Sequence, residues 1–100
     1  MPLFELTLLA KEAHELGLVN RVVPDDELDA FVDGWAARLA AGPPIALSLS
    51  KKLLNDASLR TMQQALEAEA TSQSITLASH DTADAFAAFV EKRDPSFEGR

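Results

Sequence analysis

Cysteine and tyrosine are absent from the sequence, and glycine occurs only four times. Without cysteine there can be no disulfide, no thiolate nucleophile and no cysteine-ligated metal. Basic residues are also scarce, since 9 Lys and Arg face 16 Asp and Glu and give a net charge of −7. This balance disfavours nucleic acid as a partner, because phosphate contacts need clustered basic side chains.

Long hydrophobic runs are missing as well, so no segment is predicted to span a bilayer. The opening sequence MPLFELTLLAKEA is apolar, but it lacks a basic start and carries Glu5, which makes it a poor signal peptide. We therefore expect a soluble, cytoplasmic chain with no membrane partner. Apolar residues make up 47% of the 100 residues, enough to build the core of one small domain.

Abundant alanine and the near absence of β-branched runs predict an all-α chain of four to five helices. The first helix is predicted over Leu6 to Leu16, followed by Gly17 in a left-handed conformation. The sequence GLVNRVVP then breaks the helical period. It predicts one short extended segment that ends at Pro24.

The stretch PDDELDAFVDGWAARLAAGPP gives the clearest helix signal. Asp25 is the predicted N-cap, and Gly42 closes the helix before two prolines open the next one, over about Ile45 to Asn55. Five apolar residues recur at helical spacing and form one face that we expect in a core or a subunit interface: Leu28, Phe31, Val32, Trp35 and Leu39.

Two further helices follow. The sequence TMQQ predicts a capping box between Thr61 and Gln64 at the start of a helix that runs to about Ala78. Asp81 is the predicted N-cap of the last helix, which is expected to run to about Arg93 before Pro95.

Residue types that carry out catalysis form no familiar motif. His14 and His80 are isolated, and both are expected at the surface. Glu67 and Glu69 point to different sides of a helix, which makes a poor acid/base pair. The serines lack a G-x-S-x-G setting, and there is no glycine-rich phosphate loop. We therefore predict no catalytic residue and no metal site.

One alternative remains for Glu69. If it lies beside the apolar face of its helix, its pKa would rise, and the chain could be a small enzyme in its own right.

The C-terminal helix presents Phe86, Phe89 and Val90 on one face, with Lys92 three residues after Phe89. Two interpretations are open. The cation could serve the helix C-terminus while the rings serve a core. Alternatively, a ring and a cation could hold an aromatic, phosphorylated ligand, with a purine stacked on the ring and the ammonium against a phosphate.

Four segments, in this order, resemble the C-terminal third of the enoyl-CoA hydratase/isomerase (crotonase) family. They are EAHELGLVNRVVP, ARLAAGPPIALSLSKKLLN, QQALEAEATSQSITLAS and AFVEKRDPSFEGR. The resemblance covers about residues 10–100. It implies that residues 1–24 are the last helix and extended segment of the family's core, and that residues 25–100 are its helical C-terminal assembly (trimerisation) region.

In this family, two backbone N–H groups hold the thioester carbonyl of an acyl-CoA, and one or two glutamates act as acid and base. These groups lie upstream of the matching residues. The resemblance therefore implies a fragment without the catalytic core, inactive alone. The parent would act on acyl-CoA in fatty-acid metabolism as a homo-oligomer, a trimer or dimer of trimers. No cofactor is implied beyond the CoA of the substrate.

The resemblance carries a role to two residues only. Phe89 and Lys92 match family positions that approach the CoA nucleotide bound in a neighbouring subunit. Phe97 and Arg100 match the end of the same motif without a role. Such a fragment should expose apolar surface and self-associate. The alternative is a free-standing helical interaction module that binds partner helices without CoA chemistry.

Overall fold

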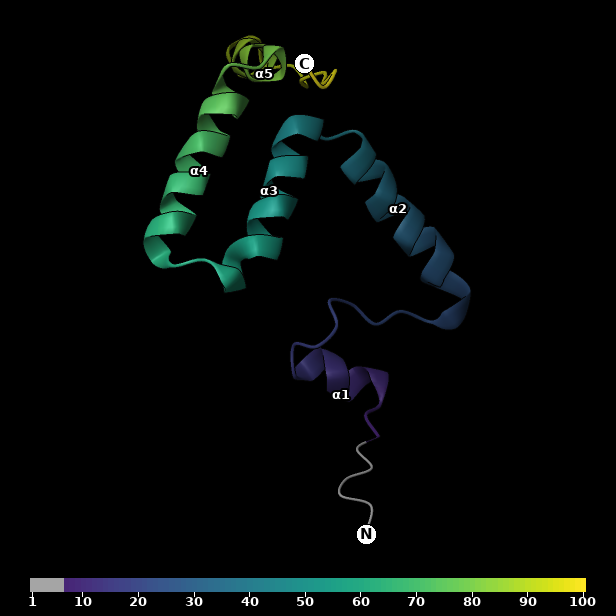
Figure 1. The fold of residues 1–100 in the computed structure, drawn as a ribbon. Coiled ribbons are helices and arrows are strands. Elements are labelled where there is room, and N and C mark those ends of the chain that lie inside the picture. The colour runs from purple at the N-terminus through teal and green to yellow at the C-terminus, as the bar shows by residue number, and fades with distance from the viewer. Residues whose placement is uncertain (1–6) are drawn as a thin grey trace. The chain divides into compact units, whose positions relative to one another are not determined.

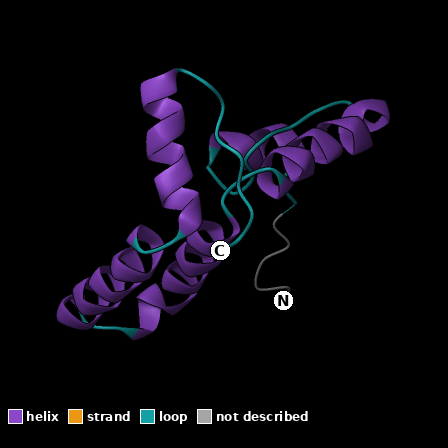
Figure 2. Ribbon diagram, turned by 90° about the horizontal axis from the view of Figure 1, so that it is seen from above, coloured by secondary structure: helices purple, strands orange, loops and turns teal. Residues whose placement is uncertain are grey.

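The computed structural model describes residues 7–100, and over this range the regular structure is helical, with no strand (Figures 1 and 2). The elements are α1 (Ala10–Glu15), α2 (Leu28–Ala40), α3 (Pro44–Asp56), α4 (Met62–Leu77) and α5 (His80–Glu91). The predicted all-α class is thus confirmed. The chain divides into two compact units, residues 1–36 and 37–100, and the boundary falls within α2.

In the first unit, α1 is a short helix whose start is held by the Glu12 carboxylate, which accepts the Leu9 N–H at 3.0 Å. Gly17 follows it with φ 78°, the left-handed conformation predicted for this glycine. The predicted start of this helix at Leu6 lies outside the described residues.

The prediction that Asp25 caps the next helix is wrong by one residue. A 3₁₀ turn, Asp25–Glu27, precedes α2, and the residue at its cap position is Pro24, without a side-chain cap. The turn closes where the Glu27 N–H donates to the Pro24 carbonyl at 2.9 Å. Because proline fixes an extended entry and offers this carbonyl, the turn starts before the Asp25 carboxylate can act as a cap.

In the second unit, α3 and α4 lie side by side and antiparallel (Figure 1). Pro44 occupies the first turn of α3, as the double proline predicted. The predicted capping box at the start of α4 is confirmed. The Gln64 N–H donates to the Thr61 hydroxyl at 3.2 Å, and the Thr61 N–H donates to the Gln64 side-chain oxygen at 3.0 Å.

Helix α5 begins and ends differently from the prediction. Its N-cap is Ser79, whose hydroxyl accepts the Thr82 N–H at 3.2 Å, whereas Asp81 lies inside the first turn. Ser79 and Asp81 are both good capping residues by type. Ser79 is favoured, because its hydroxyl also donates to the Thr76 carbonyl in α4. The helix ends at Glu91, before Pro95 can act.

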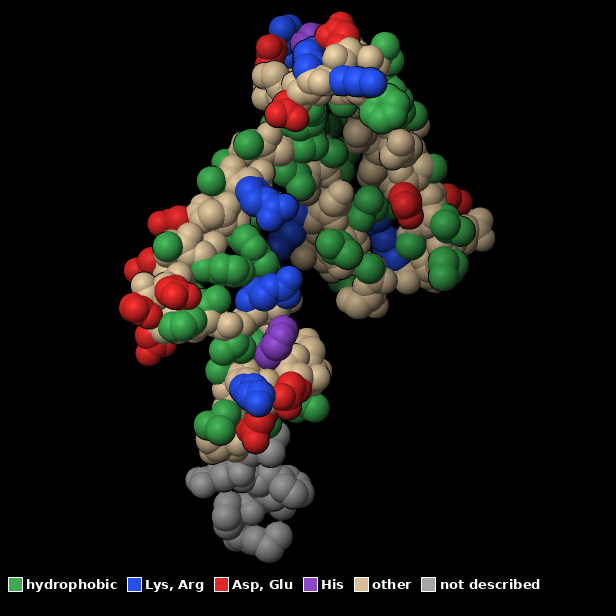
Figure 3. All heavy atoms as spheres, turned by 180° about the vertical axis from the view of Figure 1, so that it is seen from behind, with side chains coloured by type: hydrophobic (Ala, Val, Ile, Leu, Met, Phe, Trp, Pro, Cys, Tyr) green, Lys and Arg blue, Asp and Glu red, His purple; other side chains and the backbone are tan. Residues whose placement is uncertain are grey.

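Little of the chain is buried. Within residues 7–100, Ala88 and Asp81 are the two buried residues, and many large apolar side chains lie open (Figure 3). The predicted apolar face of α2 is among them, with Trp35 39% and Val32 50% exposed. This confirms the expectation of exposed apolar surface. Each helix of residues 7–100 is too short or too polar to span a bilayer.

Candidate functional site

The end of α5 is a turn centred on Lys92, which has φ 56° and ψ 42°. This left-handed conformation is uncommon for a residue with a Cβ atom. The Lys92 N–H donates to the Phe89 carbonyl at 3.4 Å, and the Arg93 N–H donates to the Ala88 carbonyl at 3.0 Å. The two bonds form a Schellman motif, in which glycine is the usual residue. A strained lysine therefore marks this helix end.

Phe89 lies in the last turn of α5 and is 84% exposed, more than Phe86 at 66%. Lys92 is exposed as well. The helical spacing predicted that Phe89 and Lys92 share one face of the last helix. This is wrong for Lys92, because α5 ends at Glu91 and Lys92 lies in the turn that follows. Both side chains nevertheless belong to the same helix end and are open to a ligand.

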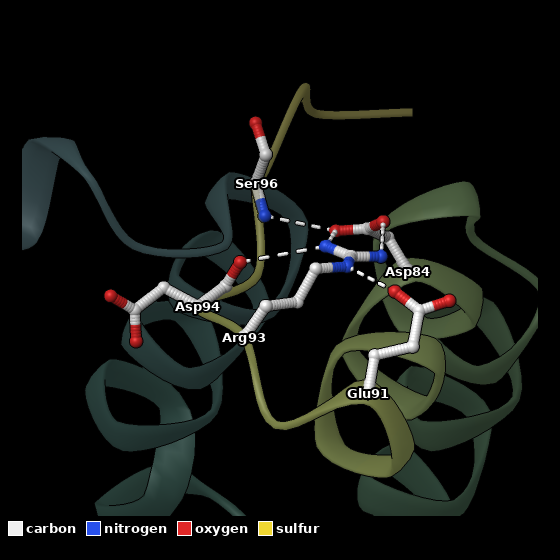
Figure 4. Close-up of polar contacts among 5 residues, drawn as sticks. All are labelled: Asp84, Glu91, Arg93, Asp94 and Ser96. Carbon is white, nitrogen blue, oxygen red and sulfur yellow. Dashed lines mark hydrogen bonds and ion pairs between the residues drawn. The ribbon is translucent and has the colours of Figure 1, made fainter.

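A charged cluster holds the chain after this turn (Figure 4). The Arg93 guanidinium donates to both Asp84 oxygens, at 2.8 and 3.4 Å, and to the Glu91 carboxylate at 2.6 Å. The Ser96 N–H donates to the second Asp84 oxygen at 2.9 Å. Asp84 thus ties the residues that follow α5 back onto the helix.

These contacts shift the titration of both partners. The hydrogen bond from Arg93, followed by that from the Ser96 N–H, holds the pKa of Asp84 below its ordinary value. The hydrogen bonds to Asp84 and then to Glu91 raise the pKa of Arg93. Since the ionised forms are favoured, the pair stays charged at neutral pH.

The C-terminal strap, defined here as residues 94–100, runs back along α5 and ends beside its first turn. Asp81, only 3% exposed, is the anchor. Its two carboxylate oxygens accept the N–H of Glu98 at 2.7 Å and that of Gly99 at 2.9 Å. The Asp81 N–H in turn donates to the Arg100 carbonyl at 3.1 Å. A carboxylate near a helix N-terminus is also favoured by the helix dipole.

Gly99 brings the strap against α3. It has φ 75°, and a Cβ atom placed on it would lie 3.2 Å from the Pro44 ring. Both the positive φ and the close approach favour glycine here.

An apolar groove of about 500 Å³ is lined by α3, the end of α4, α5 and the strap. Four polar residues contribute to its lining: Thr76, Ser79, Asp81 and Thr82. The groove is otherwise mostly apolar, and its larger side chains are Pro43, Ile45, Phe86, Phe89 and Phe97. Three of these are phenylalanines, from two turns of α5 and from the strap.

The other residues considered from the sequence lie outside this region or at its exposed edge. His14 and His80 are exposed, as predicted. Glu67 and Glu69 are exposed on α4, so the apolar cleft required by the small-enzyme hypothesis is not present around Glu69. The described residues hold no cluster of three His, Asp or Glu side chains suited to a metal.

Sequence reasoning missed the roles of Asp81, Asp84 and Phe97. Asp81 was expected to cap the helix, but its side chain binds residues 17 and 18 positions further along the chain. No local spacing encodes such a contact. The signal that was available is the glycine at position 99, because a glycine in a short polar tail indicates a constrained turn.

Comparison with known proteins identifies the family. The family model for enoyl-CoA hydratase/isomerase matches residues 1–100. The 1,2-epoxyphenylacetyl-CoA isomerase of Escherichia coli K12 is 34% identical over 93 residues, which are 93% of this chain and 36% of that protein. The crotonyl-CoA hydratase of Syntrophomonas wolfei is 34% identical over 88 residues, 88% of this chain and 34% of that protein.

A solved structure agrees. The enoyl-CoA hydratase from Polaromonas sp. JS666 superposes with a TM-score of 0.85 at 33% identity, over 91% of this chain and 35% of that one. The chain thus belongs to the enoyl-CoA hydratase/isomerase (crotonase) family, and it spans about a third of the length of the relatives that it matches.

Proposed function

We propose that this chain is the helical assembly region of an acyl-CoA enzyme of the crotonase family, and that Phe89 and Lys92 contact the CoA nucleotide. In this proposal residues 1–24 belong to the catalytic core of the fold, and residues 25–100 form the assembly region. The protein acts in the cytoplasm as a trimer or dimer of trimers, and the nucleotide is held by a neighbouring subunit. No catalytic step is assigned to the carboxylates of this chain.

The observation that carries the nucleotide contact is the exposed end of α5. An 84% exposed phenylalanine stands three residues before an exposed cation in a strained turn. A purine can stack on an open ring, and an ammonium group is a natural partner for a phosphate. Strain at a helix end is retained where function requires the side chain, which supports a role for Lys92.

The assembly role is supported by the apolar side chains that are exposed on the surface of the chain. Apolar side chains stay open along α2 and α5, and faces of this kind mark interaction sites in soluble proteins. Copies of the chain could cover these faces in a closed, symmetric oligomer.

The nucleotide contact is tested by titrating 3′-phospho-ADP, the nucleotide part of CoA, into the isotope-labelled chain and following amide shifts by NMR. We expect shifts at Phe89 and Lys92. The variants Phe89→Ala and Lys92→Ala should each weaken binding about tenfold, as stacking and charge-assisted contacts of roughly 1–3 kcal/mol imply.

Matched controls separate this contact from general charge and apolarity. Val90→Ala removes a neighbouring side chain that is 79% exposed, and Lys51→Ala removes an exposed cation from α3. Both should bind like the unaltered chain. Shifts scattered over all basic residues, or equal losses in the controls, would reject the nucleotide contact.

The exposed apolar faces also favour a second candidate, a helical interaction module without CoA chemistry. It would bind partner helices, and Phe89→Ala and Lys92→Ala would leave the nucleotide titration featureless, as in the unaltered chain.

A further inference from the structure

We propose that Asp81 and Asp84 are positioning residues that dock the C-terminal strap along α5, and that the docked strap supplies Phe97 as one wall of the apolar groove. The proposal concerns the groove and does not depend on CoA binding.

The first step is the burial of Asp81. A carboxylate that is 3% exposed is costly unless hydrogen bonds compensate for the lost hydration. Here the compensation comes from the strap, whose Glu98 and Gly99 N–H groups each bind one carboxylate oxygen. Hydrogen bonds to an ionised acceptor are stronger than neutral ones. The strap and the buried carboxylate therefore stabilise each other.

The second step is the anchor at the other end of the strap. Asp84 accepts the Ser96 N–H and also binds Arg93, the residue that completes the turn after α5. Asp81 and Asp84 are three residues apart, so they lie on the same side of the helix. One holds residues 98 and 99, and the other holds residue 96.

Phe97 lies between these two anchors. With the flanking N–H groups of Ser96 and Glu98 bound, the backbone of residue 97 is fixed on both sides. Its ring faces the groove together with Phe86, Phe89 and Ile45. If the strap were released, the groove would lose this wall, while the helices on its other sides would remain.

The test uses the complete 100-residue chain with three isosteric variants. Asp81→Asn and Asp84→Asn each remove the negative charge and one of the two acceptor oxygens of an anchor. Asp94→Asn is the matched control, because the Asp94 carboxylate points away from the cluster in Figure 4 and only its carbonyl is bound. Two readouts are followed by NMR: amide hydrogen exchange of the strap, and the ¹⁹F signal of fluorophenylalanine at position 97, assigned with Phe97→Leu.

We expect Asp81→Asn to speed exchange at Glu98 and Gly99 about tenfold or more, which corresponds to the loss of a charge-assisted bond. Asp84→Asn should do the same at Ser96. In both variants the ¹⁹F signal of Phe97 should move toward its value in the urea-unfolded chain. Exchange within α4 and all signals of Asp94→Asn should stay unchanged.

The proposal is overturned if the strap amides and the Phe97 signal are unaltered in both anchor variants, or if Asp94→Asn changes them equally. Should Asp81→Asn lose its helices, Asp84→Asn decides the question alone, since its partners lie at the surface. Retained protection at Ser96 would then reject the proposal. Because these readouts need no nucleotide, this outcome is distinguishable from failure of the CoA contact.

Discussion

Lys92 is proposed to contact the CoA nucleotide, and its backbone conformation is strained. Its φ of 56° places a Cβ atom in a conformation that costs about 1–2 kcal/mol for an L-residue. We expect Lys92→Gly to raise the free energy of unfolding by about 1 kcal/mol, because glycine relieves the strain and the Schellman bonds remain. Urea denaturation followed by circular dichroism measures this change.

Lys51→Gly is the control for this substitution. Lys51 lies inside α3, where glycine costs about 1 kcal/mol. Opposite signs for the two variants would support the strain at Lys92, and equal destabilisation would reject it.

Asp84 makes the docking of the strap depend on pH. Its pKa is lowered first by Arg93 and then by the Ser96 N–H, with a smaller effect from the charge of His80. A carboxyl with a lowered pKa in the folded state contributes its full stabilisation above its ordinary pKa and loses it as the pH falls through the lowered value. The Ser96 amide shift should thus be constant at neutral pH and change only below about pH 4.

The same NMR titration on Asp84→Asn provides the comparison. The acid transition at Ser96 should disappear in this variant, because its side chain does not ionise. A Ser96 transition centred above pH 4, or one that survives in Asp84→Asn, would show that Asp84 does not control this contact.

Single residues were predictable from the sequence where their partners are local or belong to a motif. The position of Gly17 follows from helix-end chemistry and is confirmed. The roles of Phe89 and Lys92 within AFVEKR stay a prediction. Asp81 could not be assigned correctly, because its partners are the N–H groups of Glu98 and Gly99. Backbone N–H groups are alike in every residue, so apart from the turn that Gly99 indicates, the sequence does not show which of them a carboxylate will meet.

Among the elements, the start of α4 has the best-defined local stabilisation. Thr61 and Gln64 exchange two hydrogen bonds across the first turn. Thr61→Ala removes the hydroxyl that accepts one of them, and loss of such a cap typically costs about 1 kcal/mol. We expect this decrease in the free energy of unfolding, measured by urea denaturation.

Thr71→Ala makes the same chemical change in the middle of α4. The Thr71 hydroxyl donates to the Glu67 carbonyl at 3.1 Å, a bond that adds little to a helix already hydrogen-bonded. Alanine favours the helix more than threonine, so stability should stay level or rise slightly. An equal loss in both variants would argue against a special role for the cap.

The helices could be predicted from the spacing of apolar residues and from the glycines, prolines and capping residues between them. The errors of these predictions lie at the helix ends. Asp25 and Asp81 are both good capping residues by type, yet Pro24 and Ser79 hold the cap positions. Neighbouring residues decide both boundaries. Before α2, the Pro24 carbonyl closes the turn, and before α5, the Thr76 carbonyl accepts the Ser79 hydroxyl. Such competition is settled by three-dimensional contacts rather than by propensity.

At the scale of the whole chain, the exposed apolar faces are the dominant feature. Trp35, Leu39 and Phe86 are 39%, 61% and 66% exposed, and Ala88 is the one buried apolar residue among residues 7–100. Composition predicted enough apolar residues for a core, but it could not show that they would remain open. Surfaces of this kind favour association, because each copy removes the apolar area of another from water.

Sedimentation velocity of the purified chain, over micromolar to submillimolar concentrations, shows whether these helices form an assembly region. We expect a mass that rises with concentration well above the 10.8 kDa of one chain. A sharply folded species that stays at 10.8 kDa over the whole range would contradict it.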